Sequence, residues 1–229
     1  MIVDKKKFYT GLGMIVVFSV LLVCMFLPIL DGQNLLASMD ELYNSISKGS
    51  ANYIHDVLEE SEKLKGVDIE AGVEMNSEEE AEQTALLYTA GSAQVEVSGA
   101  HLEISGDLGH ILINAVQDAE ALYNNDADGL ARKYGYDGRR VIYNWQQSLV
   151  RLHEELEGQR LMEESKTVAE VNERAVEPAY NYFGIEPEIM ADKVGVVVGS
   201  LFFYIFYTVL YGFGIMFLFD GWGLKTRGH

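Results

Sequence analysis

The 229-residue sequence is poor in cysteine, proline and basic residues, and each shortage excludes a class of protein. Its one cysteine, Cys24, has no partner for a disulfide within the chain. A single cysteine also excludes Cys-ligated zinc, iron–sulfur clusters and CxxCH haem attachment. The three prolines are Pro28, Pro178 and Pro187, so a long proline-free stretch favours helices.

Basic residues are outnumbered, with 17 Lys and Arg against 35 Asp and Glu. Residues 31–193 hold 33 of those acids and 12 of the bases, a formal charge of −21. Nucleic-acid binding is excluded because phosphate affinity requires positive charge, and an anionic membrane surface is disfavoured for the same reason. An acidic segment attracts a basic soluble protein or a cation, although acidic faces commonly serve solubility.

Charge is absent from two long apolar runs, residues 8–30 and residues 194–219, which contain 23 and 26 residues. A helix needs about 20 apolar residues to cross a bilayer. We therefore predict transmembrane helices at 8–30 and 193–220. The alternative for the first run is a cleaved signal peptide, but its apolar stretch exceeds the usual length of about 7–15 residues.

Basic residues flank both runs on their outer sides. Lys5–Lys7 precede the first run, and Lys225 and Arg227 follow the second. Because short basic flanks stay in the cytoplasm, the tails 1–7 and 221–229 are predicted to be cytoplasmic.

The segment between the runs, residues 31–192, then lies outside the cytoplasm, in the periplasm or the extracellular space. The expected location is the cytoplasmic (inner) membrane. Trp222 and the Phe8-Tyr9 pair are predicted to share one membrane interface, as an aromatic belt.

The first half of the exported segment shows helical periodicity followed by a hairpin signal. Apolar residues recur at helical spacing over 35–57, and residues 65–76 break the pattern and are predicted to form a loop. Ser77 and Glu80 form a capping box that starts a short helix. Alternating apolar residues around Ser98-Gly99 predict a small β-hairpin.

The second half continues as helices. Asp107 is a predicted helix cap, and helical apolar spacing follows over 108–122, 141–156 and 161–175. The predicted fold class is mainly α, with two transmembrane helices flanking an extracytoplasmic antiparallel helical bundle that carries a possible small β-hairpin.

No combination of residues predicts catalysis. The histidines are scattered and make no Glu-x-x-His pair, so a di-iron bundle is excluded. Neither a P-loop nor a G-x-S-x-G motif occurs. We therefore expect no catalytic residue, no cofactor and no metal, and a protein that is not an enzyme.

Two segments admit a ligand as an alternative. Asn124, Asp126, Asp128 and Gly129 match the first ligand positions of a calcium loop, but Gly135 stands where the bidentate glutamate belongs. An Asx-rich turn between helices explains the same residues. In the second segment, Arg139-Arg140 beside Tyr143 and Trp145 could hold an anion, whereas a core tryptophan with paired arginines is the simpler interpretation.

The second apolar run carries features that a simple anchor does not need. Gly195 and Gly199 have the small-x-x-x-small spacing that lets helices approach closely. A row of hydroxyls follows at helical spacing, namely Ser200, Tyr204, Tyr207 and Tyr211. Gly11 and Gly13 of the first run lie at the opposite end of an antiparallel hairpin. We therefore predict that Gly195, Gly199 and the hydroxyl row form a helix-packing interface with another subunit.

These observations predict a non-catalytic membrane subunit or scaffold of a larger complex. Its partners are other membrane protein subunits and the lipid bilayer, with a basic soluble protein as a further candidate. Because the predicted tails are short, we expect no cytoplasmic output domain. Two alternatives stay open: a self-assembling two-span ring or channel, and a ligand-binding or calcium-binding sensor that acts through a partner.

Overall fold

The computed structural model describes residues 2–29, 32–50 and 52–224. The chain divides into two compact units. One contains the residues up to Ile46 together with those from Glu188 onward, and the other contains Ser47–Pro187. The fold is mainly helical, with two candidate membrane-spanning helices at the ends, as predicted. It also contains a small sheet of three strands, where the sequence predicted only a hairpin of two. The antiparallel bundle arrangement stays a prediction.

Helices α1 (Lys5–Phe26) and α10 (Met190–Trp222) are long and apolar enough to cross a membrane. Only 6% of the most apolar window of each is buried, so neither is the core helix of a folded domain. Helix α1 ends just before Pro28, since the residue preceding a proline is driven out of the helical region. Leu27 accordingly has extended backbone angles.

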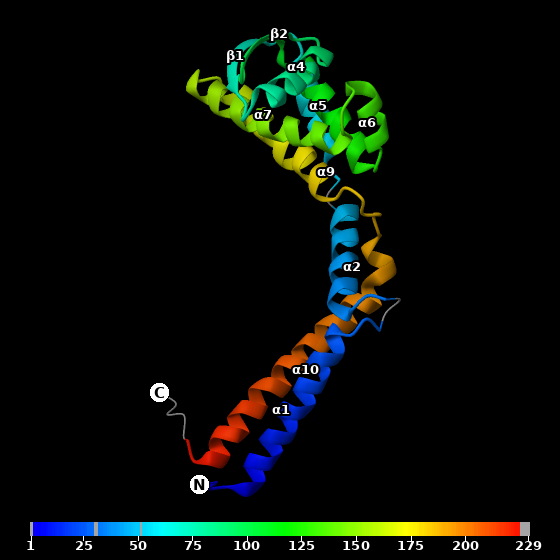
Figure 1. Ribbon diagram of the computed structural model, residues 1–229, viewed down its shortest axis with the longest axis vertical. Helices are drawn as coiled ribbons and strands as arrows, with labels where there is room; N and C mark the ends of the chain where they lie inside the picture. The colour runs from blue at the N-terminus through cyan, green and yellow to red at the C-terminus, as the bar shows by residue number, and fades with distance from the viewer. Residues whose placement is uncertain (1, 30–31, 51, 225–229) are drawn as a thin grey trace. The chain divides into compact units, whose positions relative to one another are not determined.

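Helices α1 and α10 run side by side in the first unit (Figure 1). Three glycines allow this approach. A Cβ atom on Gly11 would lie 2.6 Å from the Leu218 nitrogen, and one on Gly214 would lie 2.8 Å from Cδ1 of Ile15. A Cβ atom on Gly221 would lie 2.6 Å from Phe8. The two backbones therefore come together at positions where no side chain fits.

The free ends of the two helices are tied together. Lys7 Nζ donates to Asp220 Oδ2 at 2.9 Å. The rings of Phe8 and Trp222 are 5.6 Å apart. Phe8 and Trp222 therefore lie at the same end of the helix pair. Their placement with Tyr9 at one membrane interface stays a prediction.

The apolar stripe predicted over 35–57 belongs to two helices, α2 (Leu35–Ser50) and α3 (Ile54–Lys63). Helix α2 ends after Gly49-Ser50, two residues of low helix propensity. The Asn52 side chain then accepts a hydrogen bond from the Ile54 nitrogen at 3.4 Å, in competition with the helix.

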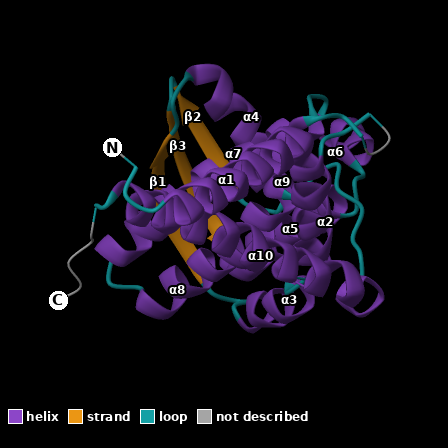
Figure 2. Ribbon diagram, turned by 90° about the horizontal axis from the view of Figure 1, so that it is seen from below, coloured by secondary structure: helices purple, strands orange, loops and turns teal. Residues whose placement is uncertain are grey.

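The second unit contains an antiparallel sheet of β1 (Asp68–Glu74), β2 (Gln94–Ser98) and β3 (His101–Asp107), in the order β1-β3-β2. The strands are orange in Figure 2. The β2–β3 hairpin is confirmed, and the prediction of a loop over 65–76 is wrong because it contains β1. Ala71 and Gly72 weaken the local strand signal, and the partner of β1 is distant in sequence.

Helices α4 (Glu78–Ala90), α5 (Leu108–Tyr123) and α7 (Gly138–Gly158) pack against one face of the sheet. Both predicted caps are confirmed. Ser77 Oγ accepts from the Glu80 nitrogen at 3.2 Å, and Asp107 Oδ1 accepts from the His110 nitrogen at 3.0 Å. The remaining helices of the unit are α6 (Ala127–Tyr134), α8 (Met162–Val171) and α9 (Glu177–Asn181).

A π-helical segment, Asn172–Val176, joins α8 to α9. The Glu177 nitrogen bonds to the Asn172 carbonyl, one residue further back than in an α-helix. Pro178 has no N–H, and in a regular helix its ring would clash with the Arg174 carbonyl. The wider turn lets the helical path continue through the proline.

Candidate functional site

The residues predicted to form a helix-packing interface occupy two faces of α10. At about 100° per residue, Ser200, Tyr204, Tyr207 and Tyr211 fall on the side of the helix that also carries Gly214. Gly195 and Gly199 fall roughly a third of a turn or more away from that side. The glycine pair and the hydroxyl row are therefore separate features of the helix.

Most of the hydroxyl row contacts its own chain. The Phe18 ring of α1 stacks on Tyr207, with centroids 4.4 Å apart, and lies 5.0 Å from Tyr211. Ser200 Oγ is 2.6 Å from the hydroxyl oxygen of Tyr43 on α2. The aromatic ring of Phe18 therefore packs against two tyrosines of the row. From the sequence, only small and polar residues of the first run were considered as partners, so this contact was not predicted.

Gly195 and Gly199 are open. A Cβ atom built on either glycine meets no atom within 4 Å. At Gly214 and Gly221, by contrast, the space for a Cβ atom is already occupied by residues of α1. Tyr204 has 65% of its surface exposed. The small-residue face near the start of α10 is thus unused by the described residues of the chain.

An apolar groove of about 510 Å³ lies beside this face, within the first unit. Gly199, Phe203 and Tyr204 line it from α10, and Met39 and Tyr43 line it from α2. Only Tyr43, Ser200 and Tyr204 among its lining residues carry a side-chain oxygen, and two of these bond to each other. The groove suits an apolar occupant, such as side chains of another helix or a hydrocarbon chain.

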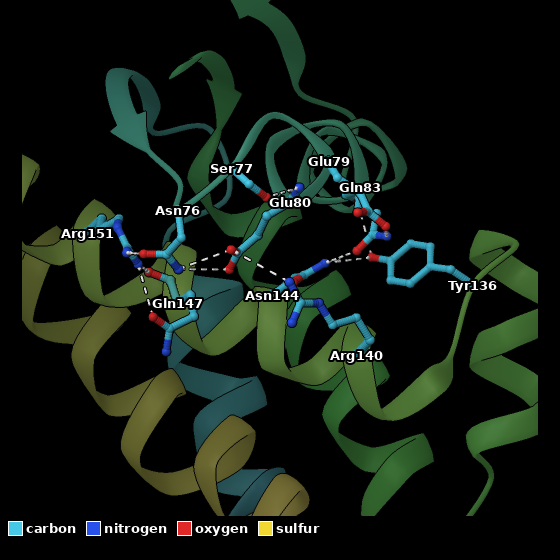
Figure 3. A network of polar contacts seen from close by, with 10 residues as sticks. All are labelled: Asn76, Ser77, Glu79, Glu80, Gln83, Tyr136, Arg140, Asn144, Gln147 and Arg151. Carbon is cyan, nitrogen blue, oxygen red and sulfur yellow. Dashed lines mark hydrogen bonds and ion pairs between the residues drawn. The ribbon is translucent and has the colours of Figure 1, made fainter. Parts of the chain in front are cut away.

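A network of polar side chains joins α4 to α7 in the second unit (Figure 3). Glu80 is only 3% exposed. Asn76 Nδ2 donates to its two carboxylate oxygens at 3.2 and 3.0 Å, and Arg140 lies 3.6 Å away. The charge of this buried carboxylate is therefore compensated inside the protein.

The rest of the network holds the same two helices. Asn144 Nδ2 donates to Gln83 Oε1 at 3.1 Å, and Tyr136 donates to the Gln83 carbonyl at 3.2 Å. Burial raises the pKa of Tyr136, so its hydroxyl stays protonated as a donor at neutral pH. Arg151 donates to Asn76 Oδ1 at 3.0 Å. The network links α4 to α7, and its polar groups are hydrogen-bonded to one another.

The arginines considered for anion binding have internal partners. The Arg139 guanidinium lies 4.6 Å from the Tyr180 ring centroid, and Arg140 lies 4.7 Å from that of Tyr143. Trp145 is fully buried, and its Nε1 donates to Asp118 at 2.9 Å. The interpretation of Trp145 as a core residue is confirmed.

The segment that resembles a calcium loop forms a helix cap. Asp126 Oδ1 accepts from the Gly129 nitrogen at 2.9 Å, and α6 begins at Ala127. Asp128 and Gly129 are therefore in a helical turn rather than an extended loop. In residues 2–29, 32–50 and 52–224, no group of three or more His, Cys, Asp and Glu is placed to hold a metal ion.

Asn125 in the same turn organises a polar latch, defined as Lys48, Tyr123, Asn125 and the segment 184–186. Its backbone is left-handed, with φ of 64°. Asn125 Oδ1 accepts from the Gly184 nitrogen at 2.8 Å, and Nδ2 donates to Glu186 at 3.1 Å and to the Ile185 carbonyl at 3.3 Å. One side chain thus fixes the stretch of chain that follows α9.

Lys48, in the last turn of α2, completes the latch. It is 1% exposed, and its Nζ donates to the Ile185 carbonyl at 2.5 Å. The Lys48 carbonyl accepts a hydrogen bond from the Tyr123 hydroxyl. Burial lowers the pKa of Lys48, because the charged ammonium loses water. No sequence pattern marks these residues as a group.

Substitution of Asn125 by glycine is expected to release the latch and to destabilise the second unit by about 1–3 kcal/mol, since it orphans several partners. Glycine keeps the left-handed backbone, so the loss reports the side chain alone. Amide hydrogen exchange at 184–186 should rise, whereas Asn124→Gly, at the preceding exposed position, should leave it unchanged. Unaltered exchange in Asn125→Gly would contradict this assignment.

Comparison with protein-family models, curated proteins and solved structures found no match for the chain. The fold and the site define a class only: a mainly helical protein with two candidate membrane-spanning helices and a small sheet.

Proposed function

We propose that the protein is a non-catalytic membrane subunit whose α10 docks against a transmembrane helix of a different protein. The observation that carries the proposal is the contrast among the glycines of α10. Residues of α1 occupy the space beside Gly214 and Gly221, whereas Gly195 and Gly199 face open space beside an apolar groove. Small residues in a lipid-exposed helix are typical of helix–helix contacts.

The proposed topology places both chain ends in the cytoplasm and the second unit on the outside. The basic cluster Lys5–Lys7 supports it, because short basic flanks stay in the cytoplasm. The other basic residues used for this orientation, Lys225 and Arg227, lie outside the described residues. In this topology, the open glycines and the groove lie toward the outer half of the bilayer.

A different protein is favoured over a second copy on grounds of charge. Each copy carries a formal charge of −21 over residues 31–193, and neighbouring copies would bring these charges together. The apolar runs 8–30 and 194–219 also lack charged residues that could line a channel. A ring or channel is therefore the second candidate, and a measured assembly mass separates the two.

Substitution of Gly199 by leucine is expected to weaken the assembly about tenfold, because overpacking a close helix contact costs about 1–3 kcal/mol. Native mass spectrometry of protein extracted from its own membranes in mild detergent measures the effect. The wild-type protein should be detected in a larger assembly with a different subunit. In Gly199→Leu, a larger fraction of the protein should be detected as the single chain.

Gly212→Leu is the matched control, because Gly212 is also open, lies on the same helix and is outside the glycine pair. It should assemble like wild type. Detection of the wild-type protein only as a monomer would contradict the proposal. An assembly made only of copies of this chain would support the ring or channel instead.

A further inference from the structure

The outer face of the sheet in the second unit is uncovered and strongly acidic. Side chains alternate across the strands, so Ile69, Val73, Leu102 and Ile104 are buried on the helix side. The opposite side carries exposed carboxylates from all three strands, namely Asp68, Glu70, Glu74, Glu96 and Glu103. No Lys or Arg lies in strands β1, β2 or β3.

This face retains an unfavourable charge arrangement. Glu96 of β2 is directly opposite Glu103 of β3, and like charges paired across strands are destabilising. His101 contacts Glu74 at 3.1 Å and Glu103 at 2.9 Å, at one end of the sheet. Among the described residues, Glu70 and Glu96 form no ion pair. The face therefore offers uncompensated negative charge.

The same face is hollowed. A depression of about 430 Å³ is lined by Glu70, Gln94, Glu96, Glu103 and Ser105, together with Val95 and Ile104. A second depression, of about 610 Å³, continues past Asp68 and Asp107. Neither depression has a basic lining residue.

Strand β2 also has a free edge. Among the strands of the described residues it pairs with β3 alone, and four of its five residues are exposed. In an antiparallel pair, alternate residues point their N–H and C=O groups away from the neighbouring strand. An edge of this kind accepts an added strand from another chain. By contrast, the Glu70 carbonyl of β1 already accepts Gln159 Nε2 at 2.9 Å.

We infer that the β2 edge and the acidic sheet face form a docking surface for an extended basic segment of a partner protein. The segment adds a strand beside β2 through its backbone. Its alternate lysine or arginine side chains lie over Glu96 of β2 and extend toward Glu103 of β3. A second copy of this chain is the wrong occupant, because its own Glu96 would meet Glu96 across the new edge.

The surface deepens the proposed function by naming a contact outside the membrane, yet it does not depend on α10. The Gly199→Leu variant leaves the sheet unchanged and should bind the basic probe like wild type. Failure of this inference therefore differs from failure of the membrane-docking proposal.

The test uses the full-length protein in detergent and an acetylated peptide of about ten residues that alternates lysine with valine. Fluorescence anisotropy measures binding, and hydrogen exchange measures amide protection over 94–98. We expect saturable binding with protection of β2. A peptide of equal charge with a central proline, which cannot add to the edge, should bind at least about tenfold more weakly.

Glu96→Lys separates docking from stability. It should weaken peptide binding by at least about tenfold and raise the melting midpoint, since it replaces a like-charge pair with an ion pair. Glu120→Lys, an exposed change of the same charge on α5, should keep the affinity of wild type. Three results would overturn the inference: equal binding of the proline peptide, wild-type binding by Glu96→Lys, or dimerisation through β2.

Discussion

Replacement of Asp118 by alanine is expected to lower the free energy of unfolding by about 3–5 kcal/mol, the range for breaking a buried charged network. Asp118 is 2% exposed on α5. Its carboxylate accepts from Lys133 Nζ at 2.7 Å, from the Tyr134 hydroxyl at 2.5 Å and from Trp145 Nε1 at 2.9 Å. One side chain therefore joins α5 to α6 and α7.

The expected loss of stability is large because the buried donors to Asp118 have no access to water as a replacement acceptor. Trp145 is fully buried and Tyr134 is 8% exposed, so each would keep an unpaired donor. Burial, followed by the neighbouring Asp118 charge, raises the pKa of Tyr134, and its hydroxyl remains protonated at neutral pH. Asp118→Asn should also destabilise, because its amide group turns two donors toward a cluster that already consists of donors.

Denaturant unfolding of the full-length protein, followed by Trp145 fluorescence in a Trp222→Phe background, measures the change. Glu120→Ala is the matched control, since Glu120 is exposed on the same helix. It should stay within about 0.5 kcal/mol of the parent. A similarly small effect for Asp118→Ala would show that the buried network does not stabilise the second unit.

Substitution of Gly11 by leucine is expected to separate α1 from α10. The new Cβ atom would lie 2.6 Å from the Leu218 nitrogen and 2.7 Å from the Gly214 oxygen, and neither is the end of a flexible side chain. Overpacking of this kind costs about 1–3 kcal/mol, or roughly five-fold to more than a hundred-fold in the packed population.

The native pair of Lys7 and Asp220 reports this contact directly. Their 2.9 Å separation allows a zero-length carbodiimide crosslink, which mass spectrometry of the digested protein detects. Gly11→Leu should lose the crosslink, and Gly13→Leu should keep it, because a Cβ atom on Gly13 meets nothing within 4 Å. Equal crosslinking in both variants would contradict the observed helix packing.

The features predicted correctly from the sequence have local causes. The apolar runs, the caps at Ser77 and Asp107, and the turn at Gly99 depend on residues close together in the chain. The packing of Trp145 in the core follows the helical spacing of its apolar neighbours.

The features that were missed depend on distant partners. Strand β1 is stabilised by β3, more than twenty-five residues away. The latch at Asn125 joins residues of three separate segments. Helical spacing placed the hydroxyls on one side of α10 but could not show that Phe18 covers two of them. The open state of Gly195 and Gly199 likewise became visible only in the packed helix pair.

The central claim, that the open glycine face of α10 docks a helix of a different protein, is tested most directly by site-specific photo-crosslinking in native membranes. A photoreactive amino acid replaces Gly199 in one variant and Gly212 in the other. The account predicts a single protein adduct from position 199, of a mass that differs from two copies of this chain, and lipid adducts alone from position 212. Lipid adducts alone from position 199, or the same protein adduct from both positions, would contradict it.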